Sequence, residues 1–123
     1  MAPTSKVGPI CLESLHTMQP MSSHADAIET AVLTVAGHTD RALREAILAG
    51  AGAACGLGEP ADPPADLAPL LDKIWRNAYK VVDRDIETLR AAGHTDDALF
   101  EVIVSAAAGA GLARLRRGLE LMD

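Results

Sequence analysis

DRDIETLRAAGHTDDALFEVIVSAAAGAGLARLRRGLELM, the stretch from Asp83 to Met122, decides the fold of this chain. Between the two parts of this stretch, Gly93 can enter the left-handed region that ends a helix, and Thr95 or Asp96 can cap the next one. The stretch therefore predicts a short helix, a corner, and a long helix from Asp96 to about Met122. Apolar residues recur in the long helix at steps of three and four, the helical period: Leu99, Ile103, Ala106 and Ala110.

The composition favours a bundle of helices. Of 123 residues, 49% are hydrophobic but only three are aromatic, so Ala, Leu, Val and Ile must build the interior. Small side chains bury little area each and let helices approach closely. This length suits one domain. We therefore expect an all-α bundle of about five helices, with further burial between subunits of a homo-oligomer.

The same period predicts the remaining helices. We expect residues 1–22 to be a mobile tail and residues 23–123 to form a single all-α domain. The expected helices cover 23–36, about 41–56, 66–82 and 83–92, and a proline-rich break lies at 58–65. The first helix is expected to point Ile28, Ala31, Val32 and Val35 inward, and Asp66 is expected to cap the third.

Charge and cysteine content exclude several classes of protein. The net charge of −6 argues against nucleic-acid binding, which needs a basic surface. The two cysteines, Cys11 and Cys55, suggest no disulfide framework, so a cytoplasmic location is expected. No apolar run of about 18 residues was recognised, which predicts no membrane partner. No secretory signal is recognised at the start.

The sequence contains an internal echo. AGHTDRALREAILAGA at 36–51 and AGHTDDALFEVIVSAA at 92–107 share AGHTD and then Ala, Leu, Glu and Ile at matched places. One interpretation is that two helix corners use the same geometry, and the other is duplication of a helix pair. The corner histidines, His38 and His94, lack the further ligands that a metal site needs, so no metal is expected. Cys55 follows a helix, where thiols are not activated, and is expected to be a small buried hydrophobe.

LRAAGHTDDALFEVIVSAAAGAGLARL is similar to the helix-corner-helix of the alkylhydroperoxidase D / carboxymuconolactone decarboxylase family. The resemblance covers about Asp66 to the C-terminus, and it implies an all-α fold and homo-oligomers. Peroxidases of that family carry CxxCxxxH just before this corner. In register, this chain has Ala78 and Val81 in place of the cysteines and Asp85 in place of the histidine. Because the chemistry needs a thiolate and a resolving thiol, thiol peroxidase activity is expected to be absent.

Two functions remain open. The first is a non-redox accessory or assembly protein, without cofactor, that serves a partner enzyme. The alternative is a cofactor-free lyase or isomerase of small molecules, as in the decarboxylase branch of the family, with a pocket at the junction of the third and fourth helices. Its candidate acid–base residues are Tyr79, Asp83, Asp85 and His94, and Lys73 or Arg84 would bind an anionic substrate.

Overall fold

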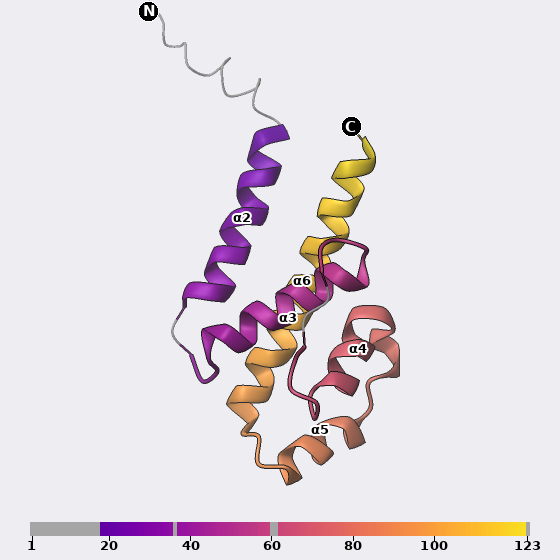
Figure 1. Ribbon diagram of the computed structural model, residues 1–123. Helices are drawn as coiled ribbons and strands as arrows, with labels where there is room; N and C mark the ends of the chain where they lie inside the picture. The colour runs from indigo at the N-terminus through magenta and orange to yellow at the C-terminus, as the bar shows by residue number, and fades with distance from the viewer. Residues whose placement is uncertain (1–17, 36, 60–61, 123) are drawn as a thin grey trace, which may run out of the picture.

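The computed structural model describes residues 18–35, 37–59 and 62–122, with side chains from residue 23 onward. Within these ranges the chain forms five α-helices and no strand, which confirms the predicted all-α class. The helices, shown in Figure 1, are α2 (Met18–Thr34), α3 (Arg41–Ala54), α4 (Ala68–Arg76), α5 (Asp83–Ala91) and α6 (Asp96–Met122), with a short 3₁₀ turn η1 (Ala78–Lys80) between α4 and α5.

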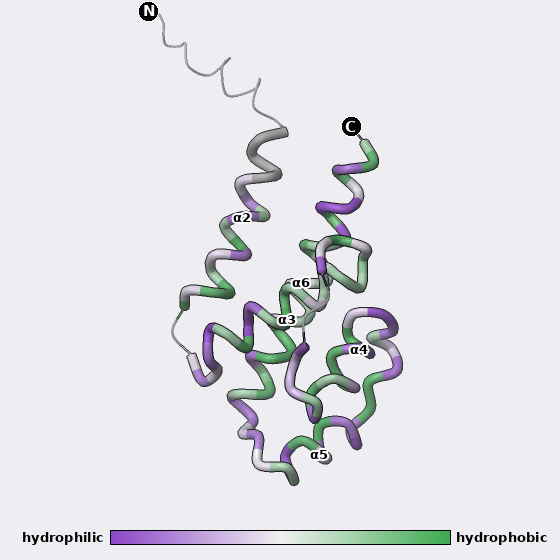
Figure 2. Tube along the Cα trace, in the orientation of Figure 1, coloured by the Kyte–Doolittle hydropathy of each residue, from purple (hydrophilic) through white to green (hydrophobic). Residues whose placement is uncertain are grey.

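The long helix α6 organises the bundle. α3 crosses it, α4 packs beside it, and α2 also contacts it (Figure 1). Hydrophobic segments gather where these helices meet (Figure 2). As predicted, Leu99, Ala106 and Ala110 are buried, and Ile103 packs against the core. The other core residues come mainly from α4 and its N-cap, with one each from α3, α5 and α6: Ile47, Leu67, Leu70, Leu71, Ile74, Leu89 and Val102.

Two glycines allow close approach of helices. At Gly109 on α6, an added Cβ would lie 3.0 Å from Leu48 Cδ2 and 3.1 Å from Ala51 Cβ on α3. At Gly50 on α3, it would overlap the indole ring of Trp75. The small residues therefore lie at the helix crossings, as the composition suggests.

Contrary to the expectation from the sequence, α6 is long and apolar enough to cross a membrane by length and composition alone. The helix also supplies much of the bundle's interior, including Val102, Ser105, Gly109 and Ala113. A helix that packs a core on one side reaches such hydropathy without a membrane. Less than half of its apolar window is buried, however, so part of its surface is uncovered.

Several predicted boundaries were wrong. α2 begins at Met18, so the end of the predicted tail is helical, and residues 1–17 lie outside the described part of the chain. α4 ends at Arg76 rather than near residue 82, because Asn77 adopts φ −148° and ψ 65°, outside the helical region. Asp66 does not cap α4, since Leu67 occupies the cap position.

The prediction for the apolar stripe of α2 was also wrong. Ile28 is 49% exposed and Val35 is 62% exposed, and Ala25 is the buried residue of the described part of this helix. Polar contacts instead hold α2 in place. Arg116 on α6 pairs with Glu29 at 3.0 Å, and the carbonyl groups at the end of α2 accept hydrogen bonds from α3. The stripe is therefore left without a covering element in the described chain.

The two AGHTD corners differ in how the following helix is capped: the Thr39 hydroxyl donates to Glu101, and Asp40 makes no side-chain cap hydrogen bond to α3, so the two corners do not share one solution at the cap. Gly93 has φ +106°, and the Thr95 hydroxyl accepts a hydrogen bond from the Ala98 N–H at 3.1 Å, as predicted. In the first corner, Gly37 allows close packing, because a Cβ there would lie 2.6 Å from Glu101 Oε2. Duplication of the helix pair stays a hypothesis.

Candidate functional site

The Asp85 carboxylate, the central residue of the predicted pocket, is held by two structural contacts. Lys73 Nζ lies 2.8 Å and 3.0 Å from its two oxygens, and the Val82 N–H donates to Oδ2 at 2.8 Å. The hydrogen bond from Lys73, and then that from Val82, holds the pKa of Asp85 below its ordinary value. A carboxylate that caps α5 and pairs with a lysine is a weak general base.

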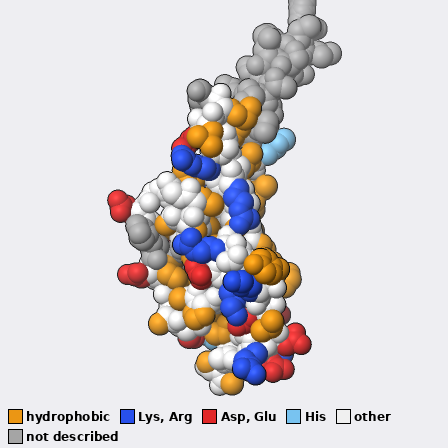
Figure 3. Space-filling view, turned by 90° about the vertical axis from the view of Figure 1, so that its right-hand side faces the viewer, with side chains coloured by type: hydrophobic (Ala, Val, Ile, Leu, Met, Phe, Trp, Pro, Cys, Tyr) orange, Lys and Arg blue, Asp and Glu red, His pale blue; other side chains and the backbone are white. Residues whose placement is uncertain are grey.

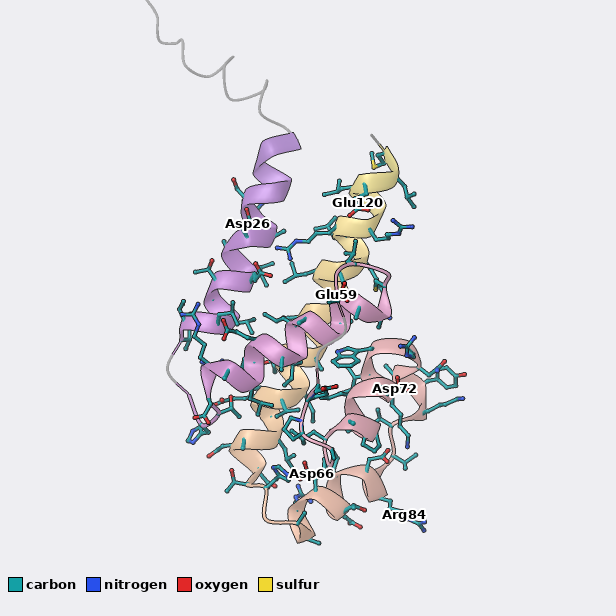
Figure 4. The ribbon with its side chains drawn as sticks, viewed as in Figure 1. Asp26, Glu59, Asp66, Asp72, Arg84 and Glu120 are labelled. Atoms are coloured by element: carbon teal, nitrogen blue, oxygen red, sulfur yellow. The ribbon has the colours of Figure 1, made fainter. Side chains whose placement is uncertain are left out.

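The other predicted residues do not converge on Asp85. Tyr79 lies on η1 and is 81% exposed. Asp83 and Arg84 are exposed at the start of α5, where Arg84 points away from the bundle (Figure 4). Among the described residues, no hydrogen bond or ion pair joins either Tyr79 or His94 to Asp85. The structure therefore brings together Lys73 and Asp85 only.

His94 instead pairs with Asp66, at 2.6 Å between Nε2 and Oδ2. This contact joins the segment before α4 to the α5–α6 corner, and the hydrogen bond from His94 lowers the pKa of Asp66. An imidazole oriented by a carboxylate can transfer protons. Sequence reasoning missed Asp66 in this role, because no local signal connects residues 28 positions apart.

Cys55 is a free, half-buried cysteine at the C-terminal cap of α3. The described residues contain no group of three His, Cys, Asp or Glu side chains placed to hold a metal ion. Cys55 follows α3 as the sequence indicated, but it is half-buried rather than buried as predicted, because the Gly56 turn beside it is open to solvent.

A polar cluster ties the first corner to α6. Arg44, only 7% exposed, donates hydrogen bonds to the carbonyl groups of Leu33, Val35 and Thr39. Its Nη1 lies 3.7 Å from Glu101 Oε1. This buried arginine was not singled out from the sequence, because its partners are backbone groups and a distant glutamate.

Glu101 completes this cluster from α6. It accepts hydrogen bonds from the backbone N–H of His38 at 2.5 Å and of Thr39 at 2.8 Å, and from the Thr39 hydroxyl at 2.7 Å. The hydrogen bond from the His38 N–H is the main reason that the pKa of Glu101 lies below its ordinary value. The cluster fixes how α2 and its corner sit on α6.

Beside this cluster, an apolar hollow of about 290 Å³ lies between α2 and α6. Large apolar side chains surround it and stay open to solvent: Phe100 is 68% exposed and Val104 is 42% exposed. We call the surface formed by Ile28, Val32, Val35, Phe100 and Val104 the α2–α6 face. It combines the uncovered stripe of α2 with the outward side of α6.

A larger, open groove of about 630 Å³ lies among α2, α3 and α6. Carboxylates surround it, including Glu59 and Glu120, labelled in Figure 4, and Glu29, which pairs with Arg116. None of the six residues predicted from the sequence lines either hollow.

On the α4 side, shown in Figure 3, Lys and Arg side chains run down the surface among scattered apolar ones. The α2–α6 face is therefore the strongest candidate for a functional surface.

Comparison with known proteins adds no identification: no family model, no curated protein and no solved structure matches this chain.

Proposed function

We propose that this protein is a non-catalytic helical accessory or assembly protein that acts through the α2–α6 face. The observation that carries the proposal is the exposure of Val35 and Phe100, at 62% and 68%, on neighbouring elements beside one hollow. A cluster of large apolar side chains exposed to water is unfavourable and is typical of interaction surfaces. Phe100 lies on α6 and Val35 directly follows α2, and the Val35 carbonyl is held by the buried Arg44, so the surface is pre-formed.

The state of the catalytic candidates supports this proposal. The Asp85 carboxylate pairs with Lys73 and accepts a hydrogen bond from the Val82 N–H at the start of α5, and Tyr79 is 81% exposed. An acid–base site needs its groups within reach of one substrate. The resemblance to a non-redox alkylhydroperoxidase D-like protein is part of the same proposal, since such a chain would keep helices and assembly without thiol chemistry.

The alternative, a cofactor-free lyase or isomerase, is favoured by one observation, the His94–Asp66 pair. In that function His94 would move a proton and Asp66 would orient its ring. His94→Gln would then abolish turnover of the substrate while leaving the helices intact, whereas an accessory protein would keep its binding.

Site-specific photo-crosslinking in the cells that produce the protein tests the proposal. p-Benzoylphenylalanine replaces Phe100 in one variant and Tyr79, which is also exposed but lies on η1, in the control. We expect a discrete protein adduct from position 100 and none of that kind from position 79. Equal, diffuse adducts from both positions, or none from position 100, would contradict a contact function for the α2–α6 face.

A further inference from the structure

The outward side of α6 carries a regular stripe. Six exposed residues follow one another at alternating steps of three and four: Asp97, Phe100, Val104, Ala107, Gly111 and Arg114. This is the spacing of the contact positions of a coiled coil, in which one helix packs along another. The buried residues of α6, such as Leu99 and Ala106, lie on its other side. At the two ends of the stripe, Asp97 lies 3.8 Å from His38 Nε2 and Arg114 donates to the Trp75 carbonyl. The four residues between them, from Phe100 to Gly111, are exposed.

Gly111 packs against no other element in the described part of the chain. A Cβ added there would meet nothing within 4 Å, unlike one at Gly109, which faces α3. Glycine inside a helix is less favourable than alanine by about 1 kcal/mol. The position is therefore a gap in the surface of an exposed helix, and a gap of this kind allows another side chain to enter.

The stripe is complementary to itself when a second α6 is laid against it in the opposite direction. With the two-fold axis between residues 105 and 106, three kinds of pair form, each at equal distances from that axis. Asp97 meets Arg114 of the partner subunit, Phe100 meets Gly111 of the partner subunit, and Val104 meets Ala107 of the partner subunit. Opposite charges meet at the ends, and the largest side chain meets the smallest.

We propose that the protein forms a two-fold symmetric dimer through antiparallel pairing of α6 over the Asp97–Arg114 stripe. The contact is about 26 Å long, and an isologous interface of this type contains every pair twice. The apolar residues of α2, together with Val35 directly after it, flank the paired helices and extend the contact. The inference rests on the proposed contact function and names its partner as a second copy of this chain.

Charge reversal tests the pairing. Asp97→Arg places arginine against Arg114 of the partner subunit, and Arg114→Asp places two aspartates together, so each variant alone should dimerise about tenfold more weakly or worse. In an equimolar mixture, both ends of the mixed dimer carry opposite charges. We expect sedimentation velocity to show dimers of the wild-type chain, monomers of each variant, and restored dimers only in the mixture.

A second pair of variants tests the gap. Gly111→Leu fills the space for Phe100, whereas Gly118→Leu adds the same side chain to another open position of α6, beyond the stripe. We expect loss of dimer for Gly111→Leu alone, with unchanged helix content by circular dichroism. Arg114 also donates a hydrogen bond to the Trp75 carbonyl at 2.6 Å, and the Arg114→Asp variant loses that contact. The two glycine variants keep it, so they test the dimer without this change to the fold.

The outcomes separate the two proposals. A wild-type chain that stays monomeric, or a dimer that none of these variants weakens, overturns the α6 pairing. If the crosslink from position 100 then identifies a different protein, the contact function stands and only the identity of its partner was wrong. If no crosslink forms from position 100, both proposals fail.

Discussion

The packing of Trp75 over Gly50 gives the sharpest prediction about the interior. Trp75 is the single tryptophan of the chain, and a Cβ at position 50 would overlap its ring. Gly50→Ala should therefore push the indole out of its place between α3 and α4. The α4 backbone cannot follow freely, because Ile74 beside it is 9% exposed in the core.

Two opposing effects set the size of the change. Overpacking a well-filled site costs about 1–3 kcal/mol, while replacing glycine by alanine inside a helix returns about 1 kcal/mol. We expect Gly50→Ala to lower the free energy of unfolding by about 1 kcal/mol. In a Trp75→Leu background the obstacle is gone, so the same change should raise it by up to about 1 kcal/mol.

Urea unfolding of the four chains in this cycle measures the coupling between the two positions. Tryptophan fluorescence of Gly50→Ala gives a local readout, and its emission should shift to longer wavelength as the indole gains contact with water. Equal effects of Gly50→Ala in both backgrounds, with unchanged emission, would refute the packing of Trp75 over Gly50.

Two further predictions concern α6. Gly109→Ala should lower the free energy of unfolding by about 1 kcal/mol, because Ala51 Cβ cannot rotate away from the added methyl group. Gly118→Ala adds the same group in open space and should raise the free energy of unfolding slightly. Thermal unfolding of the two variants measures the difference. Because contacts lower the pKa of Glu101, its carboxylate stabilises the fold above the ordinary glutamate range, and this contribution is lost as pH falls through the lowered pKa. Glu101→Gln should therefore flatten the acid side of the stability–pH profile, and Glu45→Gln, at the matching place of the repeat, should not; identical profiles for the two variants would contradict the role of Glu101.

The sequence predicted those parts of the fold that depend on local chemistry. Gly93 and Thr95 form the corner expected of them, because a left-handed glycine and a capping hydroxyl act on their own neighbours. The buried side of α6 follows from its period. Asn77, which ends α4, lies inside an apolar period that continues past it, so periodicity alone extended that helix.

The rest depends on contacts between distant segments. The period of the first helix grouped Ile28 to Val35 on one face, but the prediction that this face points inward was wrong, because a period does not say what covers a face. The hydrogen bonds between Glu101 and the first corner join residues more than sixty positions apart. Glu45 occupies the same place in the other copy of the repeat, so the sequence alone did not distinguish the two glutamates. The predicted site was composed of chemically suitable residues, whereas the candidate surface consists of apolar residues with no local signature of function.

Antiparallel pairing of α6 is tested most directly by an isotope-filtered nuclear Overhauser experiment on an equal mixture of labelled and unlabelled chains. Phe100 is the single phenylalanine of the chain, so its ring protons are assigned without ambiguity. Within one α6, Phe100 and Gly111 lie about 16 Å apart, too far for a direct signal. Antiparallel pairing of α6 predicts an intermolecular signal between the Phe100 ring and the Gly111 α-protons. A dimer without that signal, or a monomer, rules the pairing out.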